Sequence, residues 1–253
     1  MIARLKHLFQ QPRTEQVLKG LPDKHRVYAV GDIHGRLDLL QVVHQKIFQH
    51  AKAYQGAKVV VYLGDYVDRG PHSKQVVDYL LANSLPDFKA VYLLGNHEQV
   101  LLQFLEGHSL ALAHDWFGFG GLATLQSYGV TLRGIPTQKD LPRLQAEFVE
   151  KCPATHRQFY QSLALSFELG GYFFVHAGIK PTLPLTKQIA DDMLWIRDEF
   201  LNSRKQFEKV IVHGHSVNVK PEIKSNRIGL DTGAYATGLL TCAVFEGERV
   251  DIL

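Results

Sequence analysis

The segment KVVVYLGDYVDRG, residues 58–70, holds the clearest fold signal in this chain. It opens with Lys58–Leu63, a short apolar run that is typical of a buried strand. Glycine and a carboxylate, Gly64-Asp65, follow at once, and Ser73–Leu81 then reads as a helix. The segment therefore predicts a strand, a loop and a helix in succession.

Units of the same form lie on either side of this segment. The preceding unit is predicted as a strand at Val27–Val30 and a helix from Arg36 to about Tyr54, and the following unit as a strand at Ala90–Leu94 and a helix at Glu98–Leu105. Alternation of strands and helices is typical of a parallel-rich sheet covered by helices. The three units therefore predict an α/β protein.

The remaining segments give weaker signals. Glycines, prolines and polar helical patches mix from Ser109 to Ser162, which we interpret as an irregular, largely helical insertion. Met1–Gln10 (MIARLKHLFQ) is predicted as a short amphipathic helix. The closely spaced late strands indicate a second, more antiparallel sheet. These strands are expected at Leu165–Leu169, Tyr172–His176, Val210–His213, Ile228–Leu230, Leu239–Phe245 and Arg249–Ile252.

The composition is that of an ordinary globular protein. Hydrophobic residues make up 45% and charged residues 21% of the 253 residues, which excludes disordered, collagen-like and disulfide-scaffold classes. No basic run accompanies the net charge of +3, so we expect no nucleic acid as a partner. No apolar stretch approaches the ~20 residues that cross a bilayer, so no membrane partner is expected either. Cys152 and Cys242 are expected to be buried free thiols of a cytoplasmic protein. The 13 histidines are the one unusual count, and histidine is the commonest metal ligand.

Polar side chains gather where the predicted strands end. Five segments have this character: Gly31–Gly35 (GDIHG), Gly64–Gly70 (GDYVDRG), Gly95–Glu98 (GNHE), His176–Gly178 (HAG) and His213–Ser216 (HGHS). Each alone is commonly a turn or a helix cap. Ligands of open α/β sheets bind beyond the carboxyl ends of the strands, which is where these segments fall. Hard oxygen ligands with imidazole suit Mn, Fe or Zn rather than a thiolate site, so together the segments predict a divalent metal site.

The set of motifs also resembles a known family. GDIHG, GDYVDRG, GNHE, HAG and GHS are similar to the phosphoprotein phosphatase branch of the calcineurin-like metallophosphoesterases, over Gly31 to Ser216. Trp195-Ile196-Arg197 and Asp231–Ala234 resemble further segments of bacterial and phage members. Leu94 stands where eukaryotic members carry arginine, and HAG replaces their HGG, so their rules for docking regulatory subunits do not transfer.

The resemblance implies a fold and a domain organisation. The fold would be an α/β four-layer sandwich of two mixed β-sheets flanked by helices, with the helical insertion around 109–162. All of 1–253 would form a single domain, because motifs from residue 31 to residue 216 must meet at one site. Residues 1–25 would form an N-terminal extension packed on that domain.

The resemblance further implies a site for two divalent metal ions, with manganese expected and iron or zinc as alternatives. Asp32 and His34 would hold the first ion and Asp65 would bridge both. Asn96, His176 and His215 would complete the second ion or reach across to the first. Two metals ~3.5–4 Å apart stabilise both oxygens of an in-line phosphoryl displacement, and a bridging water or hydroxide would attack phosphorus directly.

Four further residues, besides Asn96, receive roles from the same resemblance. His97 would be the general acid, oriented by Asp68, and Arg69, Arg197 and Asn96 would hold the phosphate. For Asp68-Arg69 the alternative is a surface ion pair, and for Arg197 an ordinary amphipathic turn. His213 is interpreted as a residue behind the ligands or a structural one, and Asp231 and Thr232 as loop anchors.

Two enzymatic functions and one non-enzymatic function compete. The leading hypothesis is a monomeric phosphomonoesterase acting on phosphorylated proteins or peptides at serine or threonine, with tyrosine as a further candidate. The alternative is hydrolysis of dinucleoside polyphosphates such as diadenosine tetraphosphate. A metal-binding scaffold without activity is disfavoured because every expected position is filled. Trp116, Phe117 and Phe119 either line the pocket rim or form a small satellite core.

Overall fold

The computed structural model of the protein describes residues 20–253 except 83–84, 108–109, 133 and 135. The helix predicted at Met1–Gln10, and all of the N-terminal extension before Gly20, lie outside the described residues. Leu21 is buried, and its N–H donates a hydrogen bond to the carbonyl of Gly247 at 2.8 Å. The chain therefore enters the described part beside the turn that precedes its last strand.

The first of two five-stranded sheets contains the strand of the opening motif. Its strand order is β10-β9-β1-β2-β3, where β1 and β2 and then β2 and β3 pair in parallel, while β9 is antiparallel to both of its neighbours. The register places Val27 of β1 opposite Val59 of β2. The strands are β1 (His25–Val30), β2 (Ala57–Tyr62), β3 (Lys89–Tyr92), β9 (Cys242–Glu246) and β10 (Arg249–Ile252).

The second sheet has the order β4-β5-β6-β8-β7. Its three central strands, β5, β6 and β8, are parallel, and the two edge strands pair antiparallel with their neighbours. The strands are β4 (Ser166–Leu169), β5 (Tyr172–Val175), β6 (Val210–His213), β7 (Glu222–Ile223) and β8 (Arg227–Gly229). Both sheets are mixed, as the fold class predicts.

The predicted assignment of the late strands was wrong in two respects. The strands expected at Leu239–Phe245 and Arg249–Ile252 are β9 and β10, which belong to the first sheet. The second sheet also has a parallel centre rather than an antiparallel one. The burial of these strands accounts for both differences. β5 is buried on both faces, and so is most of β9. Strands covered on both faces lie in the interior of a sheet, whereas an antiparallel sheet at the surface commonly has one face in water.

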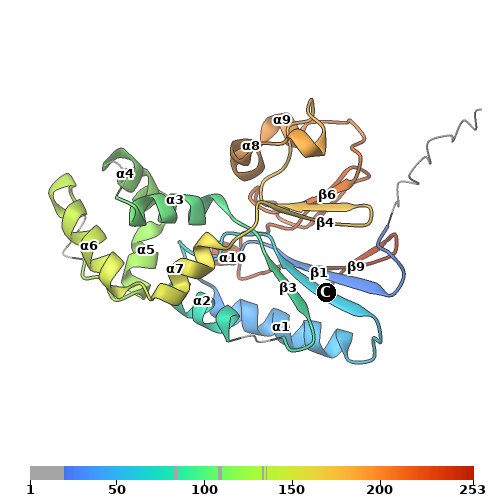
Figure 1. Cartoon of the computed structure of the whole chain (residues 1–253), viewed down its shortest axis with the longest axis horizontal. Helices are drawn as coiled ribbons and strands as arrows, with labels where there is room; N and C mark the ends of the chain where they lie inside the picture. Colours follow the sequence, from blue (N-terminus) through green and yellow to red (C-terminus); the bar gives the residue numbers. More distant parts are fainter. Residues whose placement is uncertain (1–19, 83–84, 108–109, 133, 135) are drawn as a thin grey trace, which may run out of the picture.

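Helices cover the outer face of each sheet (Figure 1). α1 and α2 lie below the first sheet in this view, and α8 and α9 lie above the second, so the layers run helix, sheet, sheet, helix. The helices are α1 (Leu37–Ala51), α2 (Ser73–Leu81), α3 (Asn96–Leu105), α4 (Leu110–Gly118), α5 (Gly121–Ser127), α6 (Leu141–Lys151), α7 (Ala154–Gln161), α8 (Ala190–Trp195), α9 (Asp198–Leu201) and α10 (Ala234–Thr237), with 3-10 turns at Gln138–Asp140 and Leu185–Lys187. No helix in the described part is long and apolar enough to cross a bilayer.

Three hydrophobic cores fill the spaces between the four layers. Successive side chains of a strand point to opposite faces, so Tyr28 of β1 packs with the helices below while Val27 packs between the sheets. Phe174 of β5 joins the core between the sheets, and Phe173 points outward to meet Phe200 of α9. Each fully buried Val, Leu or Phe contributes ~1.5–3 kcal/mol to folding stability. This alternation therefore holds the two sheets against each other and against their helices.

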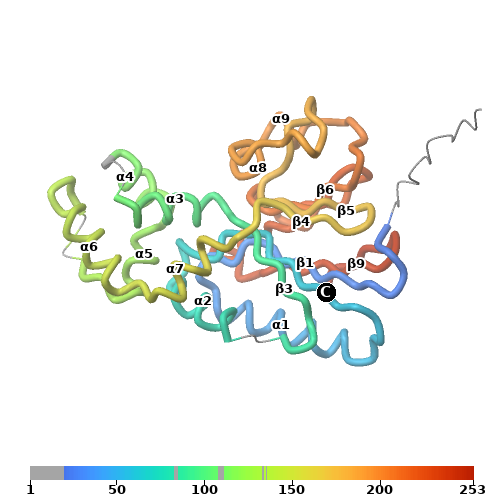
Figure 2. Tube along the Cα trace, viewed as in Figure 1, coloured from blue at the N-terminus to red at the C-terminus, as the bar shows by residue number. Residues whose placement is uncertain are grey.

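The insertion forms a helical lobe beyond the end of the first sheet (Figure 2). As predicted, its described residues are largely helical, in α4 to α7. Trp116 is fully buried, with its ring 4.7 Å from that of Phe104, whereas Phe119 is 41% exposed. Of the two alternatives for these aromatics, burial in a core therefore holds for Trp116, whereas Phe119 lies at the surface.

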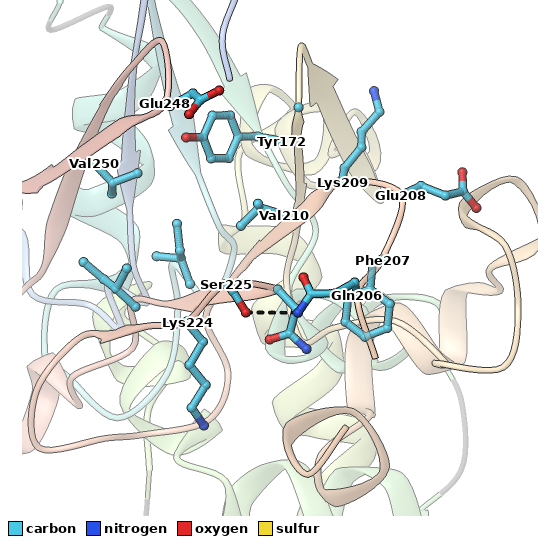
Figure 3. A pocket seen from close by; sticks show the side chains of 14 residues that line it. Tyr172, Gln206, Phe207, Glu208, Lys209, Val210, Lys224, Ser225, Glu248 and Val250 are labelled. Atoms are coloured by element: carbon cyan, nitrogen blue, oxygen red, sulfur yellow. Dashed lines mark hydrogen bonds between the residues drawn. The ribbon is translucent and has the colours of Figure 1, made fainter. Parts of the chain in front are cut away.

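A pocket of about 470 Å³ lies between the starts of β5 and β6, at the opposite ends of these strands from the predicted site (Figure 3). Tyr172, Val210 and Val250 form apolar parts of its lining. Gln206 donates a hydrogen bond to Ser225 Oγ at 3.0 Å across it. None of the predicted site residues lines this pocket.

Candidate dinuclear metal centre

The six predicted metal ligands meet at one edge of the two sheets. Asp32 and His34 follow β1, Asp65 follows β2, Asn96 begins α3 just after β3, and His176 and His215 follow β5 and β6. All six side chains are buried. The predicted strand ends thus place ligands from both sheets side by side, although they lie up to 183 residues apart in the sequence.

Asp65 lies at the centre of this cluster. Its Oδ2 is 3.5 Å from Nε2 of His34, and its Oδ1 is 3.5 Å from Nε2 of His176. Each carboxylate oxygen thus faces a different imidazole. Two groups of ligand atoms could each hold a metal ion, and Asp65 belongs to both: His34, Asp65 and His97 in one, and Asp65, His176 and His215 in the other. This is the arrangement that a bridging carboxylate needs.

Asn96 and Asp32 complete the ligand set. Asn96 Oδ1 lies 2.8 Å from His176 Nε2 and 2.9 Å from His215 Nδ1. Asp32 Oδ2 accepts a hydrogen bond from the backbone N–H of His215 at 3.0 Å. Asp32 Oδ1 and His215 Nε2 are buried and lack a hydrogen-bond partner, which is costly unless a further group binds them. The donor set and these two atoms fit divalent metal ions.

Backbone carbonyls orient two of the histidines. Nδ1 of His34 lies 2.8 Å from the carbonyl oxygen of Val67, and Nδ1 of His176 lies 2.8 Å from that of Leu63. A ring N–H donated to a carbonyl leaves Nε2 as the lone-pair nitrogen, and Nε2 is the atom that faces Asp65. Such outer hydrogen bonds commonly fix the tautomer of a metal-binding histidine.

At three of the proposed ligands, His34, His215 and Asp65, the electrostatics favour the protonation state that a metal ligand requires, and at Asp32 they oppose it. Burial lowers the pKa of His34 to about 3 and that of His215 to about 2, so both rings are neutral. Burial alone would raise the pKa of Asp65, but His176, His97 and His34 outweigh it and hold that pKa below its ordinary range. Burial, together with the charges of Asp231 and Asp65, raises the pKa of Asp32. A bound cation would offset this repulsion between carboxylates.

His97 and Asp68 form a buried pair beside the ligands. His97 Nδ1 is 2.6 Å from Asp68 Oδ2, and its Nε2 is 3.8 Å from Asp65 Oδ2. Trp116 Nε1 donates to Asp68 Oδ2 at 2.9 Å, and Thr124 Oγ1 donates to Asp68 Oδ1 at 2.5 Å. Burial alone would lower the pKa of His97, but Asp65 and the hydrogen bond with Asp68 raise it to about 9. Both contacts favour the protonated form of His97.

The two predicted phosphate-binding arginines reach the cluster from different sides. Arg69 Nη2 lies 3.4 Å from His97 Nε2, and the guanidinium stacks on the ring of Tyr235 at 4.5 Å. Arg197 is exposed, and its Nη1 donates to the carbonyl of His215 at 3.2 Å. Neither arginine forms a surface ion pair in the described part, so both guanidinium groups remain available to an anion at the ligand cluster.

Two of the three residues that were given supporting roles, His213 and Asp231, lie behind the ligands. His213 is fully buried with its ring 5.1 Å from that of Phe200, on the side of the second sheet that faces α9. Asp231 Oδ1 accepts the N–H of Gly233 at 2.8 Å, which anchors the loop before α10. Neither residue belongs to either group of possible metal ligands.

The backbone of the site is strained. Seven non-glycine residues in the described part have positive φ, and five of them are predicted site residues: His34 (45°), Asp65 (51°), Asp68 (71°), Arg69 (67°) and His215 (61°). A residue with a β-carbon pays ~1–3 kcal/mol for this conformation. Such outliers cluster where function requires them, and here they turn five side chains toward one point.

Glu98 is the main residue whose contribution the sequence did not reveal. Its carboxylate is fully buried and accepts four backbone N–H groups, from Asp65, Tyr66, Val67 and Gly95, at 2.8 to 3.2 Å. It therefore holds the turn that carries the bridging carboxylate. Its place in the GNHE motif was the available signal, but a surface helix residue would look the same in sequence.

The hydrogen bonds that hold Asp68 were also missed, because two of the three partner residues, Trp116 and Thr124, come from the insertion. Thr124 and Ser73 accept the backbone N–H of Asp68, at 2.9 and 3.0 Å, and Trp116 donates to its side chain. Nothing in the local sequence links residue 68 to residues 116 and 124, so only the folded chain shows that the insertion holds Asp68 beside His97.

Two facing mixed sheets, loops with hard metal ligands at one edge and a buried histidine–aspartate pair beside them define a metal-dependent phosphoesterase. The chain belongs to the calcineurin-like phosphoesterase family, whose model matches residues 25–234. It is thus a hydrolase of the metallophosphoesterase type.

Similar proteins carry different activities in their names. The bis(5'-nucleosyl)-tetraphosphatase PrpE [asymmetrical] of Halalkalibacterium halodurans is 26% identical over 245 residues, which cover 88% of this chain and 92% of that protein. The structure of a cold-active protein tyrosine phosphatase has a TM-score of 0.60 and 18% identity, covering 99% of this chain and 84% of that one. A candidate diadenosine tetraphosphatase structure has a TM-score of 0.56 and 24% identity, covering 90% and 92%. The two structural likenesses show the shared fold alone.

Proposed function

We propose that this chain is a dinuclear metal-dependent phosphomonoesterase that removes phosphate from phosphoserine and phosphothreonine in proteins, with phosphotyrosine as a further candidate. The observation that carries the proposal is the buried pair of His97 and Asp68, 2.6 Å apart. The alkoxide of serine or threonine is a strong base and must receive a proton as it leaves. A phosphoanhydride expels a phosphate group, a much weaker base that has less need of an acid.

Asp32, His34 and Asp65 would hold one metal ion, and Asp65, Asn96, His176 and His215 the other. When bound, the two ions would supply positive charge to the phosphoryl oxygens and lower the pKa of a water molecule between them. The role of the chain's own ligands is to arrive deprotonated, which the lowered pKa values of His34, His215 and Asp65 provide.

The remaining residues orient the phosphate and supply the proton. Arg69 and Arg197 would hold the phosphoryl oxygens from two sides as planar, charged forks. His97 would donate the proton on Nε2 to the leaving oxygen, since its Nδ1 is engaged by Asp68. Asp68 stabilises the charged imidazolium and, held by Trp116 and Thr124, keeps the ring in place. A positioned acid of this kind contributes ~10²–10⁴ in rate.

The second candidate is asymmetric hydrolysis of dinucleoside tetraphosphates, and the name of the relative from Halalkalibacterium halodurans favours it. The two candidates can be separated by kcat/KM of the Mn-loaded protein for a phosphoserine peptide, p-nitrophenyl phosphate and diadenosine tetraphosphate. We expect the phosphopeptide to be the better substrate. A clear preference for the dinucleotide would overturn the proposal.

The leaving-group argument has its own test. Replacing His97 with Asn should reduce turnover of the phosphoserine peptide far more than that of p-nitrophenyl phosphate, because nitrophenolate is a weak base that leaves without a proton. Equal loss for both substrates would show that His97 does not act as the acid.

A further inference from the structure

A polar groove runs away from the metal centre between α2 and α5. α2 packs against α5, which is a helix of the insertion lobe (Figure 1). The groove has a volume of about 450 Å³ and begins at Arg69, whose Nη2 lies 3.4 Å from the proposed acid His97. It is lined by Arg69, Pro71, Gln75, Ala123, Gln126 and Ser127.

The two walls of the groove are held together by hydrogen bonds. Ser127 Oγ of α5 accepts the backbone N–H of Lys74 in α2 at 3.1 Å and donates to the carbonyl of Thr124 at 2.7 Å. At the other end, the N–H of Arg69 donates to the carbonyl of Gly120 at 3.2 Å. The groove is therefore a formed feature of the fold, and the residue at which it meets the site, Arg69, lies beside the proposed acid His97.

Apart from Arg69, the lining carries no charge and is rich in amides. Gln75 and Gln126 are exposed, one on each wall, and neither makes a side-chain hydrogen bond within the described part of the chain. A glutamine amide offers a donor and an acceptor together, which is the complement of a peptide unit. The lining contains no aromatic ring on which a nucleobase could stack and no carboxylate that would repel an acidic phosphopeptide.

We propose that this groove binds the main chain of the polypeptide next to the phosphorylated residue, with Gln75 and Gln126 as the binding residues that hydrogen-bond to it. The inference rests on the proposed function, since a polypeptide must be the leaving group. The residues that flank the phosphorylated one would thus be bound between α2 and the insertion, and not by the metal ligands.

The test measures binding without turnover. The probe is a fluorescein-labelled heptapeptide that carries a phosphonate analogue of phosphoserine at its centre, and its Kd for the Mn-loaded protein is read by fluorescence anisotropy. Loss of one neutral hydrogen bond weakens binding roughly two- to tenfold. Q75A/Q126A should therefore raise the Kd about tenfold, while inhibition of p-nitrophenyl phosphate turnover by phenylphosphonate, which has no flanking residues, should change less than twofold.

The matched control is Q41A/Q45A, which removes two exposed glutamines of α1 and should leave both values unchanged. An unchanged peptide Kd in Q75A/Q126A, an equal weakening of phenylphosphonate, or a wild-type chain that does not bind the peptide overturns the inference. A wild-type chain that binds the peptide in this groove but hydrolyses only diadenosine tetraphosphate refutes the proposed function and leaves the groove assignment standing.

Discussion

Replacing Glu98 with Gln removes the acceptor that holds the turn around Asp65. Oε1 of Glu98 accepts the N–H groups of Tyr66 and Val67, and Oε2 accepts those of Asp65 and Gly95. An amide keeps only one oxygen, so whichever way it is oriented its NH₂ group faces two N–H donors. The substitution changes neither size nor shape, so its effects are the change in these hydrogen bonds and the loss of an ionisable group beside Asp65 and His97.

The expected magnitude follows from the two donors that lose their acceptor. A buried N–H left without a partner costs ~1–3 kcal/mol, so E98Q should lower the free energy of unfolding by about 2–6 kcal/mol. Folded proteins are stable by about 5–15 kcal/mol, so the loss is a large share of the total. Because the displaced turn carries Asp65, the metal content of the variant should fall as well.

Urea unfolding followed by the fluorescence of Trp116 and Trp195 measures the first effect, and elemental analysis the second. At a slope of ~3 kcal/mol per molar urea, the midpoint should shift down by about 0.7–2 M. Glu150 is an exposed residue of α6, and E150Q serves as the isosteric control with an unchanged midpoint. If E98Q and E150Q unfold at the same urea concentration, Glu98 does not hold the turn and the reasoning is refuted.

Three further predictions follow from the site and its surroundings. H97N should retain the metal content of the wild type in elemental analysis while kcat for a phosphoserine peptide falls ~10²–10⁴-fold; a parallel loss of metal would make His97 a ligand instead. D65N should lower the metal content of the purified protein, and full occupancy would exclude a bridging role. Burial lowers the pKa of His44 to about 4, below its unfolded value of about 6.5, so protonation favours the unfolded chain. The stability that neutral His44 contributes is therefore complete above pH 6.5 and is lost as the pH falls toward 4. Urea titrations at several pH values measure how steeply the free energy of unfolding falls between pH 6.5 and 4. H44Q should reduce this slope by up to ~1.4 kcal/mol per pH unit, and equal slopes in the variant and the wild type would contradict the prediction.

The sequence was most informative where local chemistry decides the structure. The runs before Asp32, Asp65 and Asn96 are apolar, short and end in glycine, so both the strands and the direction of the ligands could be predicted. The parallel order of the first three strands then places these ligands at one edge. No distant contact is needed for this part of the argument.

Features that depend on distant contacts could not be predicted. The strand at Cys242–Glu246 looks like any late apolar strand, and only its pairing with β1 assigns it to the first sheet. The hydrogen bond from Trp116 to Asp68 likewise joins segments 48 residues apart through an insertion without a sequence pattern of its own. Both features depend on which distant segments pack together in the folded chain. Local sequence propensities do not contain this information.

The left-handed backbone conformation at the candidate metal centre restricts which amino acids can replace the proposed ligands there. Asparagine, aspartate and histidine are the residues besides glycine that adopt this conformation most readily, and they also supply oxygen and imidazole ligands. At His34, Asp65 and His215 the backbone and the metal therefore select from the same small set of amino acids. Glutamate, an equally good oxygen ligand, lacks this preference for positive φ. Random mutagenesis of these positions should accordingly recover exchanges among aspartate, asparagine and histidine before any other ligand type.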